Sequence, residues 1–182
     1  MSAVPTLYSY VVAADSGVAP NPLGGMCSLV VCKPEIRLHA TVGDWVAGTG
    51  AGERQGRLVY AMRVTDKMTM GEYYTRFPDR ADALYDFTYD PPHQREEGPH
   101  GAKDYDRDIR GKYALLSDHF YYFGKDAPTL PEHLRGMVKS GRGHRSVSNA
   151  PYVEPFISWV EHTYEANCIY GYSSVFVPLG KK

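Results

Sequence analysis

A short basic segment, residues 139–149, reads KSGRGHRSVSN and carries the residue types that bind phosphate. Lysine and histidine supply positive charge, and each arginine offers two parallel hydrogen-bond donors. The glycines let backbone N–H groups approach an anion, and a predicted helix begins just after the segment. The alternative is a solvated loop whose Ser148 or Asn149 caps that helix. The predicted phosphate-binding residues are Lys139, Arg142, His144 and Arg145.

A second segment, residues 117–124, reads SDHFYYFG and is rich in aromatic side chains. Alternation along a strand places Tyr121 and Phe123 on one face, together with a serine and a histidine. One interpretation is a platform on which a nucleic-acid base stacks. The other is a core strand whose tyrosine hydroxyls reach water. On the first interpretation Tyr121 and Phe123 are base-binding residues.

Residues 14–25 read ADSGVAPNPLGG and follow a predicted strand. Asp15 ends that strand, where a polar side chain often faces a cleft, and Asn21 is held between two prolines. Tyr10, within the strand, is expected to contribute to an aromatic pocket. We predict that Tyr10, Asp15 and Asn21 contact a base, with ordinary turn chemistry as the alternative.

Lys33 and Arg37 form a second cationic pair. They are four residues apart in a predicted helix, so their side chains share one face. We predict that this pair lies near a phosphate at the rim of the pocket. The alternative is surface charge without a ligand.

Covalent catalysis would need a nucleophile and a base that meet only in space. Cys27 or Cys32 is a candidate nucleophile, with His119 or His144 as its partner. No G-x-S-x-G nucleophile motif is present, and a strand cysteine is most often a small buried apolar residue. The catalytic set is therefore unknown from sequence. Its candidates are His144, Asp118 and Cys32.

An acidic D-x-D-x-D pattern occurs at Asp104, Asp106 and Asp108. An EF-hand loop with this start requires a glycine at the sixth position and a glutamate at the twelfth. The chain has Ile109 and Leu115 at these positions, which excludes the EF-hand. A solvated loop balanced by lysine and arginine is the favoured interpretation.

A zinc site is not predicted either. Cys27 and Cys32 are expected to face opposite sides of one strand, and His93 and His100 have no cysteine close in the sequence. No G-x-G-x-x-G motif follows a strand and opens a helix, so a dinucleotide site is not expected. We predict neither a metal nor a cofactor.

The composition indicates a folded protein without a global affinity for nucleic acid. The chain has 182 residues, 43% of them hydrophobic, and 20 lysines and arginines against 21 acidic residues. A formal net charge of -1 means that any phosphate binding must be local. Three cysteines give no disulfide framework, so we expect a reducing, cytoplasmic compartment. Neither a signal peptide nor a membrane-spanning run is recognised, so no membrane partner is expected.

Strands and short helices must position these residues. Periodicity and turn residues predict strands at 7–15, 26–32, 42–50, 57–69 and 112–124. Helices are predicted at 33–40, 69–77, 129–138 and 151–165. A long polar surface loop is expected at about 90–111.

These helices are too few and too short to connect parallel strands in a doubly wound fold. We therefore expect a single α+β domain over residues 1–182. Its centre would be a strongly curved mixed sheet or barrel, with a few short helices and one longer helix near the C-terminus.

Several segments occur in an order that resembles a known family. They are LYSYVVAADSGVAPNPLGGMCSLVVCKPEIR, VGDWVAGTG, SDHFYYFG, GHRS and YVEPFISWV. Together they resemble the second of the numbered nucleotide-modification-associated domains, found in bacteria and phages. This resemblance covers nearly the whole chain and implies a link to modified nucleotides or to DNA base hypermodification. It supplies no catalytic residues.

A looser resemblance concerns the fold alone. A GDWV strand, a strand like RLVYAMRV and a short aromatic helix are similar to the PUA-like EVE and ASCH domains. That similarity implies a PUA-like barrel with an aromatic pocket for RNA or a modified base.

Three functions are compatible with the sequence. The first is recognition of a nucleotide or nucleic acid in a base-modification pathway, with an aromatic pocket and the basic loop holding phosphate. The second is an enzyme that modifies a nucleotide base with histidine, aspartate or cysteine in the same pocket. The third is a protein-interaction module that uses the loop at 90–111. The oligomeric state is left open.

Overall fold

The computed structural model describes residues 3–96 and 98–173. Its main sheet has six strands in the order β10–β1–β3–β4–β9–β11. They are β1 (Leu7–Val12), β3 (Trp45–Gly50), β4 (Leu58–Arg63), β9 (Phe120–Tyr122), β10 (His144–Arg145) and β11 (Cys168–Ile169).

The main sheet is mixed. β1 pairs in parallel with β3 on one side and antiparallel with β10 on the other. β4 pairs antiparallel with both β3 and β9. β1 and β3 are almost wholly buried, as expected for interior strands with few polar side chains.

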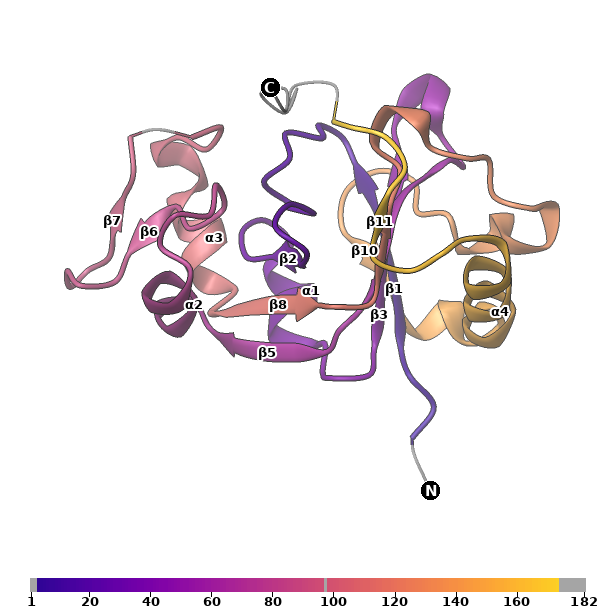
Figure 1. The fold of residues 1–182 in the computed structure, drawn as a ribbon, viewed down its shortest axis with the longest axis horizontal. Coiled ribbons are helices and arrows are strands. Elements are labelled where there is room, and N and C mark those ends of the chain that lie inside the picture. The colour runs from indigo at the N-terminus through magenta and orange to yellow at the C-terminus, as the bar shows by residue number, and fades with distance from the viewer. Residues whose placement is uncertain (1–2, 97, 174–182) are drawn as a thin grey trace.

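A second sheet of three strands has the order β2–β8–β5. Its strands are β2 (Cys27–Leu29), β5 (Asp66–Thr69) and β8 (Tyr113–Ser117). A two-stranded ribbon, β6 (Tyr85–Asp86) and β7 (His93–Gln94), lies at one end of the molecule (Figure 1).

Two long predicted strands, 57–69 and 112–124, each bend from one sheet into the other. The first becomes β4 and β5, and the second becomes β8 and β9. The backbones stay paired through the bend, where the N–H of Thr65 donates to the carbonyl of Leu116 at 2.9 Å. The predicted α+β fold with a strongly curved mixed sheet is confirmed. The sheet does not close into a barrel, because β10 and β11 are its two edges.

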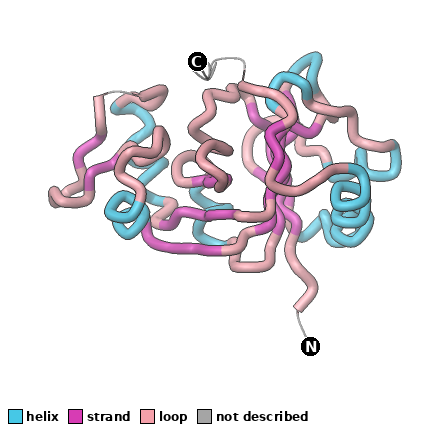
Figure 2. Tube along the Cα trace, in the orientation of Figure 1, coloured by secondary structure: helices cyan, strands magenta, loops and turns pink. Residues whose placement is uncertain are grey.

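The helices are short, and loops fill much of the chain between them (Figure 2). The α-helices are α1 (Pro34–His39), α2 (Met70–Arg76), α3 (Tyr105–Arg110) and α4 (Val153–Thr163). Short 3-10 helices occur at Gly52–Arg54, Ala102–Asp104, Gly124–Asp126, Glu132–Met137 and Val147–Tyr152. The predicted helix at 129–138 is therefore a 3-10 helix, and the longer C-terminal helix is α4. The segment 90–111, expected as a surface loop, includes β7 and α3.

Two hydrophobic clusters hold the fold together. In the first, α4 packs on the main sheet (Figure 1). The ring of Phe156 in α4 meets the indole of Trp45 edge to face, with ring centres 6.1 Å apart. The second cluster lies around the smaller sheet and α2 and includes Val31, Met68 and Tyr73. Among the described residues, no helix is both long and apolar enough to cross a bilayer.

Candidate thiol site

Cys32 lies in the turn that joins β2 to α1, and not in a strand as predicted. Val30 and Val31 are buried after β2, and the chain then turns with Cys32 at a φ of 59° and Lys33 at 38°. Such left-handed backbone is uncommon for residues with a Cβ and concentrates at functional sites. Pro34, with its fixed φ, then opens α1. Cys32 therefore lies in the turn of a strand–turn–helix unit made of β2, the turn and α1.

His100 and Asp108 lie beside this thiol. The Cys32 Sγ is 3.4 Å from the His100 Nε2, and the His100 Nδ1 is 2.5 Å from the Asp108 Oδ2. Because an ionised carboxylate only accepts hydrogen bonds, the proton on Nδ1 points to Asp108 and Nε2 faces the sulfur. The three side chains form a Cys–His–Asp relay. Sequence reasoning missed it because 68 residues separate Cys32 from His100.

Asp108 is fully buried, and hydrogen bonds fix its carboxylate. Its Oδ1 accepts the backbone N–H of Cys32 at 2.8 Å, and its Oδ2 accepts the hydroxyl of Tyr85 at 2.7 Å. Burial alone would raise the pKa of Asp108, but the hydrogen bonds from His100, Tyr85 and the Cys32 backbone outweigh it and lower that pKa. Asp108 therefore stays ionised at neutral pH.

His100 is mostly buried, with a side chain only 11% exposed. Burial acts to lower its pKa, but the hydrogen bonds and charges of Asp108 and Cys32 outweigh burial and raise the pKa to about 9. His100 is therefore a cation at neutral pH. The site resembles an ion pair in which an imidazolium lies between a carboxylate and a sulfur.

Arg37, predicted as a secondary cation, is fully buried and braces the site from behind. Its guanidinium donates to the carbonyls of Cys32 at 2.6 Å and Asp108 at 2.7 Å. Burial lowers its pKa to about 10, so it keeps its charge at neutral pH. Gly111 makes room for it, since a Cβ there would lie 2.2 Å from the Arg37 Cζ.

The chain that carries His100 is tied down on both sides. The Gln94 side chain donates to the carbonyls of His100 and Gly101 at 3.1 Å each. The Asp104 carboxylate accepts the N–H of Gly101 at 2.9 Å and pairs with Arg107 at 3.1 Å. The polar residues of the predicted loop thus hold one histidine in place.

A cavity of about 350 Å³ opens beside the relay. One wall is the end of β1 with the residues after it, and the other is the segment that carries His100. Arg107 approaches the sulfur, with its Nη2 3.6 Å from the Cys32 Sγ. The residues that line this cavity include Tyr10, Ala13, Cys32, Lys33, His100, Lys103 and Arg107.

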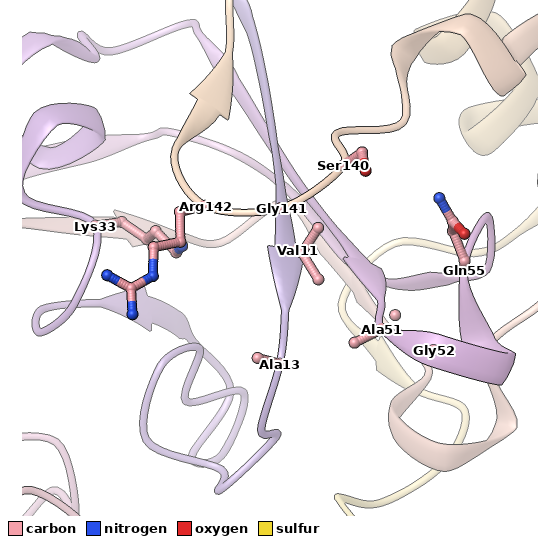
Figure 3. A pocket seen from close by; sticks show the side chains of 10 residues that line it. Val11, Ala13, Lys33, Ala51, Gly52, Gln55, Ser140, Gly141 and Arg142 are labelled. Carbon is pink, nitrogen blue, oxygen red and sulfur yellow. The ribbon is translucent and has the colours of Figure 1, made fainter.

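A second cavity, of about 410 Å³, adjoins the first and shares Val11, Ala13 and Lys33 with it. In Figure 3, Arg142 lies next to Lys33 on one side of β1, and Ala51 and Gln55 lie on the other side. Ser140 and Gly141 complete its rim. The predicted basic loop therefore reaches this cavity through residues 140–142.

The other predicted phosphate ligands line neither cavity. His144 and Arg145 form β10; His144 packs on the ring of Tyr8, and the Nε of Arg145 donates to Asn149 at 3.1 Å. Lys139 donates to the carbonyl of Ser140 in its own loop. Of the four predicted cations, only Arg142 lies at a cavity.

The predicted base-binding residues are divided between cavity and core. Tyr10 lines the first cavity and hydrogen-bonds to Tyr60 at 2.7 Å. Tyr121 is 1% exposed and stacks on Trp45, and Phe123 is also buried. The structure does not bring Tyr121 and Phe123 to the cavities that Tyr10 and Arg142 line.

Asp15 and Asn21 are both buried. The Asp15 Oδ2 accepts the Tyr122 hydroxyl at 2.6 Å, and burial raises the Asp15 pKa. Asn21 donates to Asp82 and accepts the backbone N–H of Leu23. Both lie outside the residues that line the two cavities.

The remaining catalytic candidates lie away from the relay. Asp118 is exposed in the turn between β8 and β9, and His119 pairs with Glu161 at 3.2 Å. Cys27 is completely buried. Of the catalytic candidates named from sequence, Cys32 alone is in the relay. The length of the polar segment 90–111 was the one sequence signal that pointed toward His100.

Comparison with known proteins gives one match. No curated protein and no solved structure was found to match the chain. The model of one family matches residues 4–174. The chain therefore belongs to the family described as nucleotide modification associated domain 2.

Proposed function

We propose that this protein is a thiol enzyme that acts on a nucleotide in a base-modification pathway, with Cys32 as its nucleophile. Membership of the family supports the link to nucleotide modification. The observation that carries the proposal is the Cys32–His100–Asp108 relay in the wall of a cavity. It favours the enzyme over a pure recognition role, since binding alone does not require a thiol, an imidazole and a carboxylate in series.

The same three residues also have the composition of a metal site, since their ligand atoms lie within 4.8 Å of one another. A metal would need Cys32, Asp108 and one nitrogen of His100 to face a common centre. Here the two nitrogens of His100 are divided, one toward each partner. Asp108 is also occupied by the Cys32 N–H and by Tyr85. The arrangement fits proton transfer through His100 better than chelation.

The backbone at Cys32 supports the role of nucleophile. A sharp strand–turn–helix unit with a left-handed residue exposes the nucleophilic side chain in hydrolases of the nucleophile-elbow type. Cys32 has this setting without the glycines of that motif. The backbone N–H of Lys33, next in the chain, is our candidate donor for an oxyanion.

We propose acyl transfer as the reaction. The thiolate of Cys32 attacks a carbonyl carbon, a C–S bond forms, and the carbonyl electrons move to oxygen. His100 then gives its Nε2 proton to the leaving nitrogen or oxygen, whose bond to carbon breaks, and a thioester remains. Neutral His100 next takes a proton from water as the water attacks. The C–S bond breaks, which restores the thiolate and the imidazolium and releases the acid.

The three cysteines of the chain allow a test that needs no substrate. Iodoacetamide labelling at pH 7, followed site by site by mass spectrometry, should modify Cys32 at least tenfold faster than Cys168, which is also partly exposed. Cys27 should stay unlabelled, because it is fully buried and burial raises its pKa. His100→Gln should slow Cys32 labelling about tenfold and leave Cys168 unchanged.

Equal labelling of Cys32 and Cys168, with no effect of His100→Gln, would refute the proposal. Asp108→Asn serves as the second variant. It keeps the shape of the side chain but removes the charge that orients and stabilises the imidazolium. It should slow Cys32 labelling in the same direction as His100→Gln.

A further inference from the structure

Lys33 occupies the wall between the two cavities. It follows the nucleophile in sequence, and it lines both cavities. Its ammonium lies 4.8 Å from the centre of the Tyr10 ring, a cation–π contact that fixes its position. A substrate that extends from the thiol into the second cavity would lie beside the residues that both cavities share, and Lys33 is the charged one among them.

The charge of Lys33 is poorly compensated by the protein. It is half-buried, and no carboxylate pairs with it in the described part of the chain. Burial lowers its pKa, the sulfur of Cys32 acts in the opposite direction, and Arg107 and Lys139 lower it further. A half-buried cation near other cations gains most from a bound anion.

Arg142 supplies a second free cation on the same cavity. Its side chain is exposed and makes neither a hydrogen bond nor an ion pair with any described residue. By contrast, Arg107 is already paired with Asp104 and Asp108. Lys33 and Arg142 are therefore the two cations best placed to share an incoming anion.

The loop that carries Arg142 is anchored at its base. β10 pairs with β1, and the register places His144 opposite Tyr10. Gly141 and Gly143 have φ of 72° and 86°, which lets the chain turn tightly over β1. Ordering Arg142 therefore costs less than it would on a free loop.

The rest of the second cavity suits the remainder of a nucleotide. Its floor is formed by small apolar side chains, Val11, Ala13 and Ala51, and the amide of Gln55 lies on its rim. Such a mixture of an apolar floor and a few polar groups is typical of small-molecule sites.

We infer that Lys33 and Arg142 form a phosphate subsite of the substrate, placed between the thiol cavity and the second cavity. This inference rests on the proposed function and specifies its substrate as a phosphate-bearing nucleotide. The same phosphate chemistry is offered by a free nucleotide and by a nucleic-acid strand. The experiment must therefore separate these two sources.

Binding is measured by calorimetry with five probes: inorganic phosphate, pyrophosphate, thymidine, thymidine 5′-monophosphate and a short oligothymidylate. We expect the monophosphate to bind at least tenfold more tightly than thymidine. Lys33→Met and Arg142→Met should each weaken monophosphate binding about tenfold, since each loses a charge-assisted contact. Lys139→Met is the matched control, because Lys139 is in the same loop but lines neither cavity. It should change binding less than twofold.

Several outcomes would overturn the subsite. One is equal binding of thymidine and its monophosphate, or no binding of any phosphate probe. Another is an equal loss in Lys139→Met, which would indicate a diffuse field instead of a site. Tighter binding of the oligonucleotide than of the monophosphate, still dependent on Lys33 and Arg142, supports the subsite and identifies a strand as the source.

The phosphate subsite and the proposed thiol chemistry are tested by separate measurements, so either can fail alone. Labelling of Cys32 without ligand tests the relay alone, as does its loss in His100→Gln. Rapid labelling with no phosphate binding would keep the thiol enzyme and reject the subsite. Phosphate binding that depends on Lys33 and Arg142, with an unreactive Cys32, would keep the subsite and reject the enzyme.

Discussion

Two buried aspartates of this protein are built from similar parts and have different surroundings. Asp82 and Asp108 are both fully buried, and each accepts a tyrosine hydroxyl and lies beside an arginine. Asp82 also accepts the hydroxyl of Ser28, and its partner Arg80 donates to backbone carbonyls, including that of Leu23. Every one of these contacts is made within the protein.

Asp108 differs because its chain of contacts ends in a cavity. His100 connects it to the sulfur of Cys32, which lines that cavity. The pKa directions differ as well. Burial dominates at Asp82 and raises its pKa, whereas the hydrogen bonds at Asp108 outweigh burial and lower it. A buried carboxylate thus indicates a reaction site only where its partners lead to a ligand cavity.

The largest effect that tests this contrast is expected from Asp82→Ala. Removal of the Asp82 carboxylate leaves the Arg80 guanidinium unpaired, with a side chain that is only 14% exposed. This should lower the free energy of unfolding by about 3–5 kcal/mol. Urea denaturation measures this loss. The exposed Asp79→Ala, three residues away, is the control and should change stability by less than about 0.5 kcal/mol.

Iodoacetamide labelling of Cys32 in the folded Asp82→Ala variant, measured in buffer without urea, should proceed at the wild-type rate. A drop as large as that in Asp108→Asn would contradict the contrast, because it would place both aspartates in one functional unit.

The pH dependence of the free energy of unfolding should reveal the His100–Asp108 pair. His100 binds its proton more tightly in the folded protein, with a pKa of about 9 against an ordinary value of 6.5. Its contribution, about 3 kcal/mol, is therefore fully present below about pH 6.5 and is lost as the pH rises through about 9. Asp108 behaves oppositely: its contribution is present above its ordinary value of 3.8 and is lost as the pH falls through its lowered pKa.

Urea denaturation of the wild type and His100→Gln from pH 5 to pH 10 gives the measurement. The stability difference between them should shrink steadily above about pH 6.5. A difference that stays constant to pH 10 would show that His100 is not held as a cation by Asp108.

A smaller effect on stability and on Cys32 labelling should show what the buried Arg37 contributes to the Cys32–His100–Asp108 relay. In Gly111→Ala the new Cβ would lie 2.2 Å from the Arg37 guanidinium carbon, so Arg37 must move away from the carbonyls of Cys32 and Asp108. We expect a loss of about 1–3 kcal/mol and slower labelling of Cys32. Gly71→Ala, whose Cβ would make an ordinary 3.5 Å contact with Phe87, is the control. Wild-type labelling in Gly111→Ala would show that Arg37 does not position Cys32.

The sequence by itself determined the local elements and the family. Alternation located the four inner strands of the main sheet, β1, β3, β4 and β9, and an apolar stripe located α4, because periodicity depends only on neighbours along the chain. The two-residue edge strands β10 and β11 are too short to show such a period and were not predicted. The ordered segments that resemble the nucleotide-modification family were enough to place the chain there. The basic loop was recognised, and Arg142 from it lies at a cavity.

The tertiary structure decided where the chemistry lies. Cys32 was named among several candidates, but its partner His100 is 68 residues away and Asp108 belonged to a pattern dismissed as a failed calcium loop. The pairing of β2 with β8 and the buried Arg37, which donates to the carbonyls of Cys32 and Asp108, bring these segments together. Neither leaves a periodic trace in the sequence, because closing a long segment depends on contacts between distant residues and not on local pattern.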